Sequence, residues 1–496
     1  MDFKNGFVNY EAFGAKGDGV TDDMHAICAA HAYANAHGLA VCTKPDATYY
    51  IGGQKQTCVI ATDTDWNSSR FIIDDTNVED YHAACFNVCS QLAPQELKIE
   101  KLTRDQAHID VKLEHDCYIL VENAHIKKFI RFGLNQDKGT SQHDCFVLRK
   151  DGAVDSPIDW DYDVITTVDA RPIDETTLYV RGGILTTIAN RMHEPVGYHY
   201  WRRNILITRS NTVVDGLTHM VTGETDIGCP YQGFISTHNC AFVLLRNCFA
   251  TGHKIYQTIG SLGKPVSMGT YDYDAFNVVG FTMLNCRMND ITDQTRWGVI
   301  ESSFCKNVLL EDCCLNRMDT HMGISGSYTL RRCTLGWQGL NVIGRGLLTI
   351  EDSTSYASQF ISLRSDYGST WEGDIVIRNC RWIPTGEDSY WPFLFLLWNN
   401  GMHDFGYLCS MPREVRIDGL FVDDSHAPAD YDGMYFFTDP ASHYGDEDVP
   451  TAEERPFPYG VCQQVKYRHL MTTSGFKAKL SPNADISANT VVSEEE

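Results

Sequence analysis

The sequence lacks any run of about 18 uninterrupted apolar residues, the length that a membrane-spanning helix requires. Its first residues, Met1-Asp2-Phe3-Lys4-Asn5, also lack the charged segment and apolar core of a secretory signal. Basic residues are few, with 41 Lys and Arg against 65 Asp and Glu, and the net charge is −24. Nucleic acids and anionic membranes bind surfaces of positive sign, so neither is an expected partner. We therefore expect a cytoplasmic protein.

Signatures of common cofactor sites are missing as well. The chain has no CxxC pair, no P-loop and no GxGxxG fingerprint, and no Cys or Ser stands in the setting of a catalytic nucleophile. His25, His31 and His37 recur every six residues, so on a helix they would not share one face as paired zinc ligands do. Two acidic loops, 222–231 and 269–274, offer oxygen ligands of the kind that Ca²⁺ takes, but neither has the spacing of a known calcium loop. The sequence predicts no metal and no cofactor.

Cysteine is too sparse for a disulfide scaffold, with 18 residues in a chain of 496. Several of these cysteines recur at one place in the repeat that follows. We expect buried thiols in a reducing compartment rather than disulfides.

From about residue 200 onward the chain contains a repeat of short β-rich runs, each ending in Asn-Cys or a close equivalent. The runs end at Cys248, Cys286, Cys313, Cys333, Ser353 and Cys380, which are 38, 27, 20, 20 and 27 residues apart. A period in the twenties with one β-rich run per repeat is typical of a solenoid. Apolar and Cys side chains of neighbouring coils would stack inside it, and Asn tolerates the left-handed conformation that turns the corner. The sequence predicts an all-β parallel β-helix, with an irregular β-sandwich as the alternative.

The N-terminal run Phe13-Gly14-Ala15-Lys16-Gly17-Asp18-Gly19-Val20-Thr21-Asp22-Asp23, followed by an Ala-rich stretch to His37-Gly38, resembles the opening of the pectate-lyase-like superfamily. That superfamily includes polygalacturonase-type glycosidases, pectate lyases and phage tailspike enzymes. With the repeats, the resemblance covers roughly residues 5–60 and 180–425. It implies a right-handed parallel β-helix and, because related solenoids are often trimers, a homotrimer.

The same segment predicts a helix that covers the open end of the first coil, where exposed strand edges would invite aggregation. Thr21 or Asp22 would cap this helix, which would run to about Ala36 and stop at Gly38.

The chain departs from the motifs of individual families. Asn289-Asp290 and Thr320-His321-Met322-Gly323 are faint echoes of the Asn-Thr-Asp and Gly-His-Gly elements of polygalacturonases, whose Asp-Asp and Arg-Ile-Lys elements are missing. The pectate-lyase pattern of a basic residue over calcium carboxylates is not evident either. The resemblance therefore implies the architecture and leaves the specific family unidentified.

The chain divides into four predicted parts. Residues 1–91 would form the N-terminal cap and the first coils, and 92–180 a small inserted β-rich subdomain without the corner pattern. Residues 181–425 would form the main parallel β-helix with its cleft. The repeat fades after this, so we expect an irregular extension over 426–496 that ends in a disordered acidic tail.

Side chains one coil apart stack on a β-helix, so polar residues 20–27 apart can meet. Aligning the coils at their corners predicts a polar patch with Trp297, Trp337 and Trp371 nearby. The patch consists of Asp290, Asp293, Glu301, Arg317, Asp319, His321, Arg364 and Asp366. Such a mixture is typical of a sugar site, although each Asp taken singly could be a solvated turn residue.

We predict Asp290 or Asp293, paired with Asp319, as catalytic carboxylates, and His321 as the residue that orients one of them. The predicted substrate-binding residues are Glu224, Asp226, Trp297, Glu301, Arg317, Trp337, Arg364 and Asp366. Glu224 and Asp226 belong to the loop 222–231, which could fold over the same cleft.

Three functions stay open. A glycoside hydrolase that cleaves an oligo- or polysaccharide with paired carboxylates is favoured by the acidic patch. A polysaccharide lyase or epimerase acting on a uronate-containing glycan would use Arg317, Lys306, His321 or Arg364 as base and Tyr367 as acid. A cleft lined mainly by Arg and Lys would favour this second function, and a flat aromatic face a third, a glycan-binding β-helix without catalysis.

Overall fold

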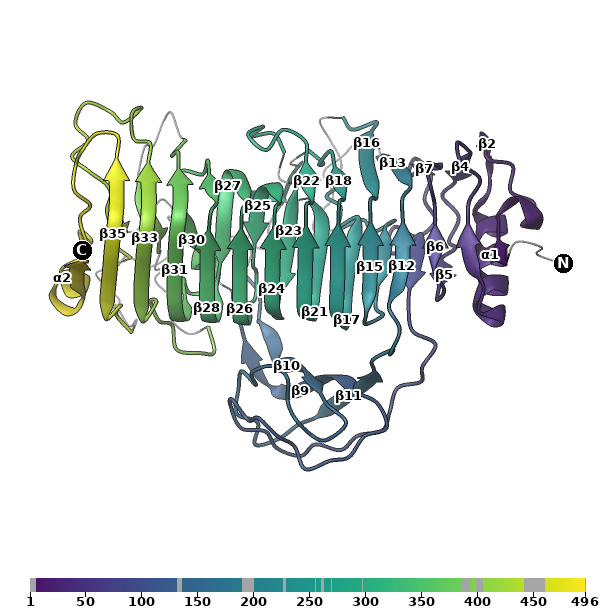
Figure 1. Cartoon of the computed structure of the whole chain (residues 1–496), viewed down its shortest axis with the longest axis horizontal. Helices are drawn as coiled ribbons and strands as arrows, with labels where there is room; N and C mark the ends of the chain where they lie inside the picture. The colour runs from purple at the N-terminus through teal and green to yellow at the C-terminus, as the bar shows by residue number, and fades with distance from the viewer. Residues whose placement is uncertain are drawn as a thin grey trace.

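The computed structural model describes residues 6–131, 136–189, 200–225, 229–254, 256–259, 263–268, 270–296, 298–385, 392–397, 405–440 and 460–495. Over these residues the chain forms one long stack of parallel strands with a second sheet on its flank (Figure 1). None of the helices in these ranges is long and apolar enough to cross a membrane.

The strands of the stack pair in parallel, coil upon coil, in three columns. The strands of the first column from β6 to β35 are labelled side by side in Figure 1. The column contains β1 (Phe7–Val8), β3 (Ala40–Cys42), β6 (Thr64–Asp65), β12 (Leu178–Arg181), β15 (Thr212–Asp215), β17 (Ile235–Arg246), β21 (Tyr271–Leu284), β24 (Cys305–Glu311), β26 (Ile324–Arg331), β28 (Gly344–Glu351), β31 (Trp371–Trp382), β33 (Glu414–Val422), β35 (Gln464–Thr472) and β36 (Val491–Glu494). The prediction of a right-handed parallel β-helix is confirmed.

The second column contains β2 (Asp18–Asp22), β4 (Thr48–Ile51), β7 (Arg70–Asp74), β13 (Ile184–Ile188), β16 (Thr218–Thr222), β18 (Phe249–Ala250), β22 (Arg287–Met288), β25 (Cys314–Asp319), β27 (Thr334–Val342) and β29 (Thr354–Ser355). The third contains β5 (Cys58–Ile60), β8 (Phe86–Val88), β14 (Ile205–Ile207), β23 (Val299–Ser303), β30 (Ile361–Leu363), β32 (Phe393–Leu396) and β34 (Tyr435–Phe437), together with one end each of β17, β21, β25 and β27. This third column carries the candidate site.

The corners form as the repeat predicts. Asn247, Asn285, Asp312, Asp352 and Asn379 all have a left-handed backbone, with φ between 47° and 57°. Asn285 Nδ2 donates to Asn247 Oδ1 one coil away at 2.9 Å, so the corner side chains also link the coils. Asn is favoured here because its short side chain tolerates positive φ and can hydrogen-bond locally.

The cysteines that follow the corners point into the core, and all 18 in the chain are free thiols. Cys286 Sγ donates to the carbonyl of Leu245 at 3.5 Å, and Cys313 Sγ to that of Met283 at 3.6 Å. Each thiol therefore fills the core as a small apolar group and bonds the backbone of the preceding coil.

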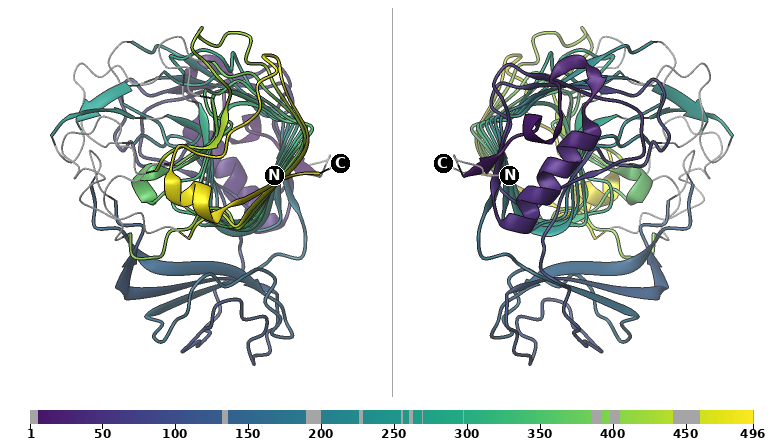
Figure 2. Two further views of the ribbon diagram at one scale, coloured as in Figure 1. Left: turned by 90° about the vertical axis from the view of Figure 1, so that its left-hand side faces the viewer. Right: turned by 90° about the vertical axis from the view of Figure 1, so that its right-hand side faces the viewer.

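A helix covers the N-terminal end of the stack, as predicted. It is α1 (Met24–His37), and Gly38 follows it with φ 63° (Figure 2, right). The predicted cap was wrong by one or two residues, because Asp23 is the N-cap. The Asp23 carboxylate instead accepts from the backbone N–H groups of Lys16 and Gly17, and so holds the preceding loop.

The flanking sheet is antiparallel and consists of β9 (Cys117–Lys128), β10 (Thr140–Leu148) and β11 (Thr167–Pro172). It has its own apolar core, which includes Ile119 and Phe146. The Tyr118 hydroxyl donates to the carbonyl of Asn277 on β21 at 2.7 Å, which fixes the sheet against the middle of the stack. This sheet lies below the β-helix in Figure 1.

The chain after residue 425 is more regular than expected. The third column continues into β34, and the first column into β35 and β36 with matched parallel register. A short helix, α2 (Ala484–Asn489), lies at this end (Figure 2, left). The expectations of an irregular extension and a disordered tail were therefore wrong for 435–437, 464–472 and 484–494. The pattern fades because the corners become Gly419 (φ 84°) and His469 (φ 52°) in place of Asn.

Candidate functional site

A row of polar residues runs along the third column at one register position. Successive coils place there Ser236, Asp274, Glu301, Asp319, Asn341 and Ser362. Their neighbours Tyr273 and Met318 belong to the core, and because side chains alternate along a strand, the row faces outward. We call these six positions the polar row. Adjacent positions in it are about 4.8 Å apart, the spacing of paired strands.

Asp319 lies at the centre of a group of basic side chains. Arg364 Nη1 donates to both carboxylate oxygens at 2.8 Å, and Arg317 Nη2 lies 2.9 Å from Oδ2. The carboxylate is 0% exposed, and burial alone would raise its pKa. The two guanidinium charges outweigh burial and hold the pKa of Asp319 well below its usual range. Asp319 is therefore a permanent anion that positions its partners.

His321 connects this anion to a tyrosine. Its Nε2 lies 2.9 Å from Asp319 Oδ2 and 3.0 Å from the hydroxyl of Tyr271. The His321 side chain is 17% exposed, whereas Asp319 behind it is buried. Because the ionised Asp319 can only accept, His321 Nε2 carries a hydrogen, which lies between the Asp319 carboxylate and the Tyr271 oxygen.

The second acid of the cluster, Asp366, is held in the same way. Arg364 Nη2 donates to its Oδ2 at 3.0 Å, and Arg131 donates to the same oxygen. Burial would raise the pKa of Asp366, but these two arginines hold it well below its usual range. Arg131 follows β9, so the inserted sheet contributes a charge to the site. Its guanidinium also lies 5.1 Å from the ring centroid of Tyr367.

This group, which we call the arginine cluster, consists of Arg131, Arg317, Arg364, Asp319, Asp366, His321, Tyr271 and Tyr367. Three guanidinium groups against two carboxylates leave one positive charge in excess, although the chain as a whole is acidic. Burial raises the pKa of Tyr367 to about 12, so its hydroxyl stays protonated near neutral pH. The side chains of Arg131, His321 and Asp366 are each 17–20% exposed and can meet a ligand.

Asp274 forms a separate polar group two coils from Asp319. Its Oδ2 accepts from Ser236 Oγ at 2.8 Å and lies 3.0 Å from His238 Nε2. Burial would raise its pKa, but the contact with His238 outweighs this and lowers it. Asp274, too, is ionised.

Asp290 and Asp293 have different partners from Asp319. Asp290 is exposed at a turn with φ 27° and accepts from Thr292 Oγ1 at 3.0 Å. Asp293 accepts from the N–H and Oγ1 of Thr295, at 2.8 and 2.7 Å. No hydrogen bond or ion pair joins either of them to Asp319 within the described ranges. The predicted pairing of Asp290 or Asp293 with Asp319 stays a prediction that these contacts do not support.

Other predicted residues gather around Arg296. Its Nη1 donates to Glu224 Oε2 at 3.1 Å, and its carbonyl accepts from Trp337 Nε1 at 3.0 Å. Glu224 and Trp337 thus lie in a second group rather than in the arginine cluster. Asp226 and Trp297 lie outside the described residues. Glu301 is described by its backbone alone, at the position in the polar row between Asp274 and Asp319.

Lys306 and Trp371 are buried and stabilise the fold rather than face a ligand. Lys306 is buried and pairs with Asp144 and Asp159 under the inserted sheet. Trp371 is 0% exposed in the core, so it is no sugar platform.

Sequence reasoning missed Arg131 and included Tyr271 and Asp274 only in the acidic loop 269–274, whereas residues 271–274 begin strand β21. Asp274 precedes Glu301 by 27 residues, the spacing of one long coil, and this signal was available. Arg131 carries no such signal, because it comes from the inserted sheet.

Two further features offer binding chemistry. A cavity of about 660 Å³ lies between the inserted sheet and the coils, and its walls include Phe129, Trp160, Phe304, Arg345 and Tyr407. The side chains of His219, His253 and Asp272 form a buried group with the donor types of a metal site.

Comparisons with known proteins find similar folds among solved structures. No family model and no curated protein sequence matches the chain. The gp54 tailspike of Acinetobacter baumannii bacteriophage AP22, solved in complex with A. baumannii capsular saccharide, aligns at 9% identity over 98% of this chain and 79% of its own, with a TM-score of 0.52. The tailspike gp49 of Pseudomonas phage LKA1 aligns at 13% identity over 98% and 84%, with a TM-score of 0.47. The polygalacturonase of Erwinia carotovora aligns at 8% identity over 96% and 94%, with a TM-score of 0.41.

At these identities the likeness to the AP22 tailspike shows a shared fold. The predicted resemblance to the pectate-lyase-like superfamily is thereby confirmed as a likeness of fold, the right-handed parallel β-helix, with the specific family unidentified.

Proposed function

We propose that this protein is a carbohydrate-active enzyme that removes the proton beside the carboxylate of a uronate-containing glycan, as a polysaccharide lyase or epimerase does. The observation that carries the proposal is the arginine cluster, in which three guanidinium groups bind Asp319 and Asp366, and Asp319 also contacts His321 of a Tyr271–His321 pair. A guanidinium pairs well with a carboxylate, and neutralising that carboxylate makes the neighbouring C5–H easier to remove.

The roles follow from the contacts within the cluster, in which Tyr271 and Tyr367 are each 4% exposed. Arg131 binds the uronate carboxylate at the edge of the cluster, and Arg364, bonded to Asp319 and Asp366, holds the two acids in place. Tyr271 releases its own proton to solvent, and its phenolate takes the C5 proton. The N–H of His321 Nε2, held between Asp319 and the Tyr271 oxygen, stabilises that phenolate. Tyr367, protonated near neutral pH, donates to the glycosidic oxygen in a lyase. In an epimerase Tyr367 instead returns a proton to the opposite face of C5, which gives the epimer.

The two acids of the cluster argue against hydrolysis at this point. A hydrolase needs one carboxyl group that is protonated at working pH, so its pKa must be raised. Arginine neighbours lower the pKa values of Asp319 and Asp366 instead. Both therefore serve as positioning residues.

Glycoside hydrolysis is the second candidate, because three acids occupy consecutive positions in the polar row. The backbone of Glu301 lies one strand spacing from that of Asp274 and one from that of Asp319, so Asp274 and Asp319 are two spacings apart. Carboxyl groups about 5–9.5 Å apart serve retaining and inverting glycosidases. In this mechanism Glu301 is the proton donor.

The test is incubation with a panel of neutral and uronic glycans, followed by mass spectrometry and by ultraviolet detection of unsaturated uronate. The proposal predicts unsaturated or epimerised products from an acidic glycan only. Tyr271→Phe and His321→Gln should each lower kcat/KM by about 100- to 10,000-fold, while Glu100→Gln, at an exposed position in the segment before β9, should leave it unchanged.

Products heavier by one water, lost in Glu301→Gln and retained in Tyr271→Phe, would replace the lyase or epimerase assignment with the hydrolase. Binding of glycans with no product from any of them would leave a glycan-binding β-helix.

A further inference from the structure

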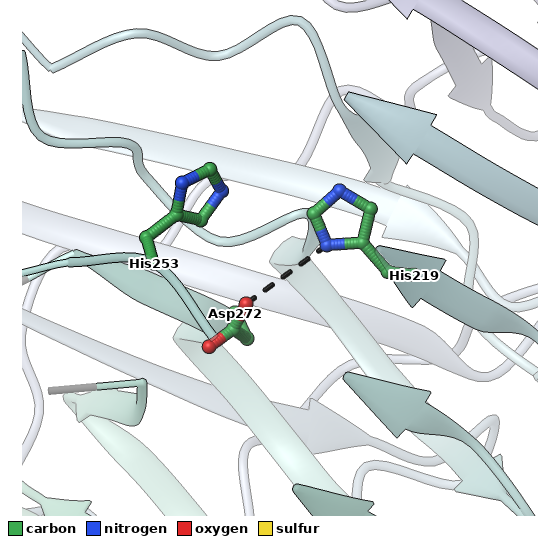
Figure 3. A group of neighbouring side chains, drawn as sticks. All are labelled: His219, His253 and Asp272. Carbon is green, nitrogen blue, oxygen red and sulfur yellow. Dashed lines mark ion pairs between the residues drawn. The ribbon is translucent and has the colours of Figure 1, made fainter. Parts of the chain in front are cut away.

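Three buried side chains from successive coils of the β-helix lie close together. They are His219 on β16, His253 three residues after β18, and Asp272 on β21 (Figure 3). Each residue is at most 2% exposed, and one donor atom from each lies within 4.8 Å of the other two. Figure 3 shows His219 and Asp272 pointing toward one another with His253 beside them.

The Asp272 carboxylate lacks the bonds that a buried carboxylate requires. Neither of its oxygens has a hydrogen-bond partner among the described residues, and neither has His219 Nδ1. The two groups face each other across 3.9 Å, which is too long for a hydrogen bond. A buried carboxylate with two unsatisfied oxygens is costly unless a cation or a proton compensates it.

The remaining ring nitrogens are held by partners that orient the imidazoles. Thr187 Oγ1 lies 2.9 Å from His219 Nε2, and Glu224 Oε1 lies 3.1 Å from His253 Nδ1. This leaves Nδ1 of His219 and Nε2 of His253 for a ligand. A carboxylate or hydroxyl behind each ligating imidazole is the usual arrangement around a metal ion.

Aromatic stacking also fixes the two rings. His219 lies parallel to Phe234 with centroids 3.6 Å apart, and His253 stacks on Tyr231 at 4.5 Å. Glu224 is itself held by the N–H of Lys254 at 3.0 Å and by Arg296. The group is therefore built on rigid surroundings, as a binding site needs to be.

We propose that His219, His253 and Asp272 bind one first-row divalent transition-metal ion, with Zn²⁺ as the expected occupant. Two imidazole nitrogens and a carboxylate oxygen suit such an ion, whereas Ca²⁺ and Mg²⁺ take oxygen ligands. Zinc bonds of about 2.0–2.2 Å place donors about 3.3 Å apart, so each distance between two donor atoms would shorten by about 1.5 Å at most.

The role of this ion is structural and independent of the function proposed above. It would join β16, the segment after β18 and β21, and thereby fasten three coils through one centre. Glu224 belongs to the segment that follows β16, so the loop that carries it would be held as well.

The test begins with the full chain, stripped with a chelator and then supplied with Zn²⁺ or, separately, Co²⁺. After desalting, elemental analysis should find about one Zn²⁺ per chain, and Zn²⁺ should raise the melting temperature. Co²⁺ should give the visible absorption of a low-symmetry nitrogen and oxygen site. Ca²⁺ should neither be retained after desalting nor raise the melting temperature.

Two variants and a control separate metal binding from folding. Asp272→Asn and His253→Gln should each reduce bound Zn²⁺ at least tenfold and abolish the Zn²⁺-dependent rise in melting temperature. Metal-free Asp272→Asn should melt no lower than the metal-free parent, because the amide removes an uncompensated buried charge. His31→Gln, a change at another buried histidine, should retain the ion.

Failure of the parent chain to retain Zn²⁺ or any other first-row divalent ion would overturn the proposal. Equal retention by parent and Asp272→Asn, with circular dichroism showing both folded, would overturn it as well. Activity on glycans plays no part in these readouts.

Discussion

The replacement Asp319→Asn tests the arginine cluster through its stability. Asp319 is 0% exposed, and its carboxylate takes bonds at 2.8 Å from Arg364 to both oxygens and a contact at 2.9 Å from Arg317. Asparagine keeps the shape but removes the charge, which leaves two buried guanidinium groups without their shared anion. Removing one partner of a buried ion pair costs about 3–5 kcal/mol. Since Asp366 still balances part of the charge of Arg364, we expect a loss of about 3 kcal/mol.

The assay is urea unfolding at pH 7, with Asp290→Asn as the control. Asp290 is exposed, so its change should stay within about 0.5 kcal/mol. A loss of less than about 1 kcal/mol for Asp319→Asn, with an unchanged denaturant slope, would refute the view that this carboxylate holds the cluster together.

The same residue predicts a dependence on pH. The pKa of Asp319 is lower in the folded chain than the value of about 3.9 for an unfolded Asp. Its stabilising contribution is therefore complete above about pH 4 and is lost as the pH falls through the folded pKa. The parent chain should lose stability over this acidic range more steeply than Asp319→Asn. Equal slopes would contradict the assignment.

Other changes have equally definite outcomes. At the corner, Asn285→Ala should lower the free energy of unfolding by about 1–2 kcal/mol, because φ is 51° there, and Asn285→Gly should lower it by less. Urea unfolding compares the two variants, and a larger loss for Asn285→Gly would contradict the reasoning. In steady-state kinetics, Arg131→Met should raise KM for an acidic glycan at least tenfold and lower kcat by a smaller factor. An unchanged KM would show that Arg131 does not bind the substrate. Tyr118→Phe should destabilise the chain by about 1 kcal/mol, since its hydroxyl fixes the inserted sheet to β21 at Asn277; no change would show that this bond does not hold the sheet.

Much of the fold was predictable because the corners have a strict conformational requirement. Asn247 and Asn285 occupy left-handed positions that few residues tolerate, so they recur visibly in the sequence. The coils beyond residue 425 use Gly419 and His469 at the same positions, and the pattern was lost for that reason. Pairing of β35 with β33 depends on backbone bonds that leave no mark in the sequence.

The site was predictable only where it follows the coil spacing. Arg317 and Asp319 lie on β25 and Arg364 directly follows β30, and the alignment of corners placed them together. Asp290 and Asp293 lie in the turn between β22 and β23, where extra residues lengthen the coil and the alignment no longer predicts neighbours. The lowered pKa of Asp319 could not be predicted from the sequence either, because the contacts of its carboxylate with the guanidinium groups depend on side-chain geometry.

The central claim, removal of the C5 proton of a uronate by the arginine cluster, can be measured directly as hydrogen exchange. The enzyme is incubated with polyuronate oligosaccharides in heavy water, and deuterium at C5 is followed by NMR together with any unsaturated product. The account predicts deuterium at C5 or loss of the C5 proton in an unsaturated product, and neither in Tyr271→Phe. Cleavage with water addition and an untouched C5 proton would contradict it.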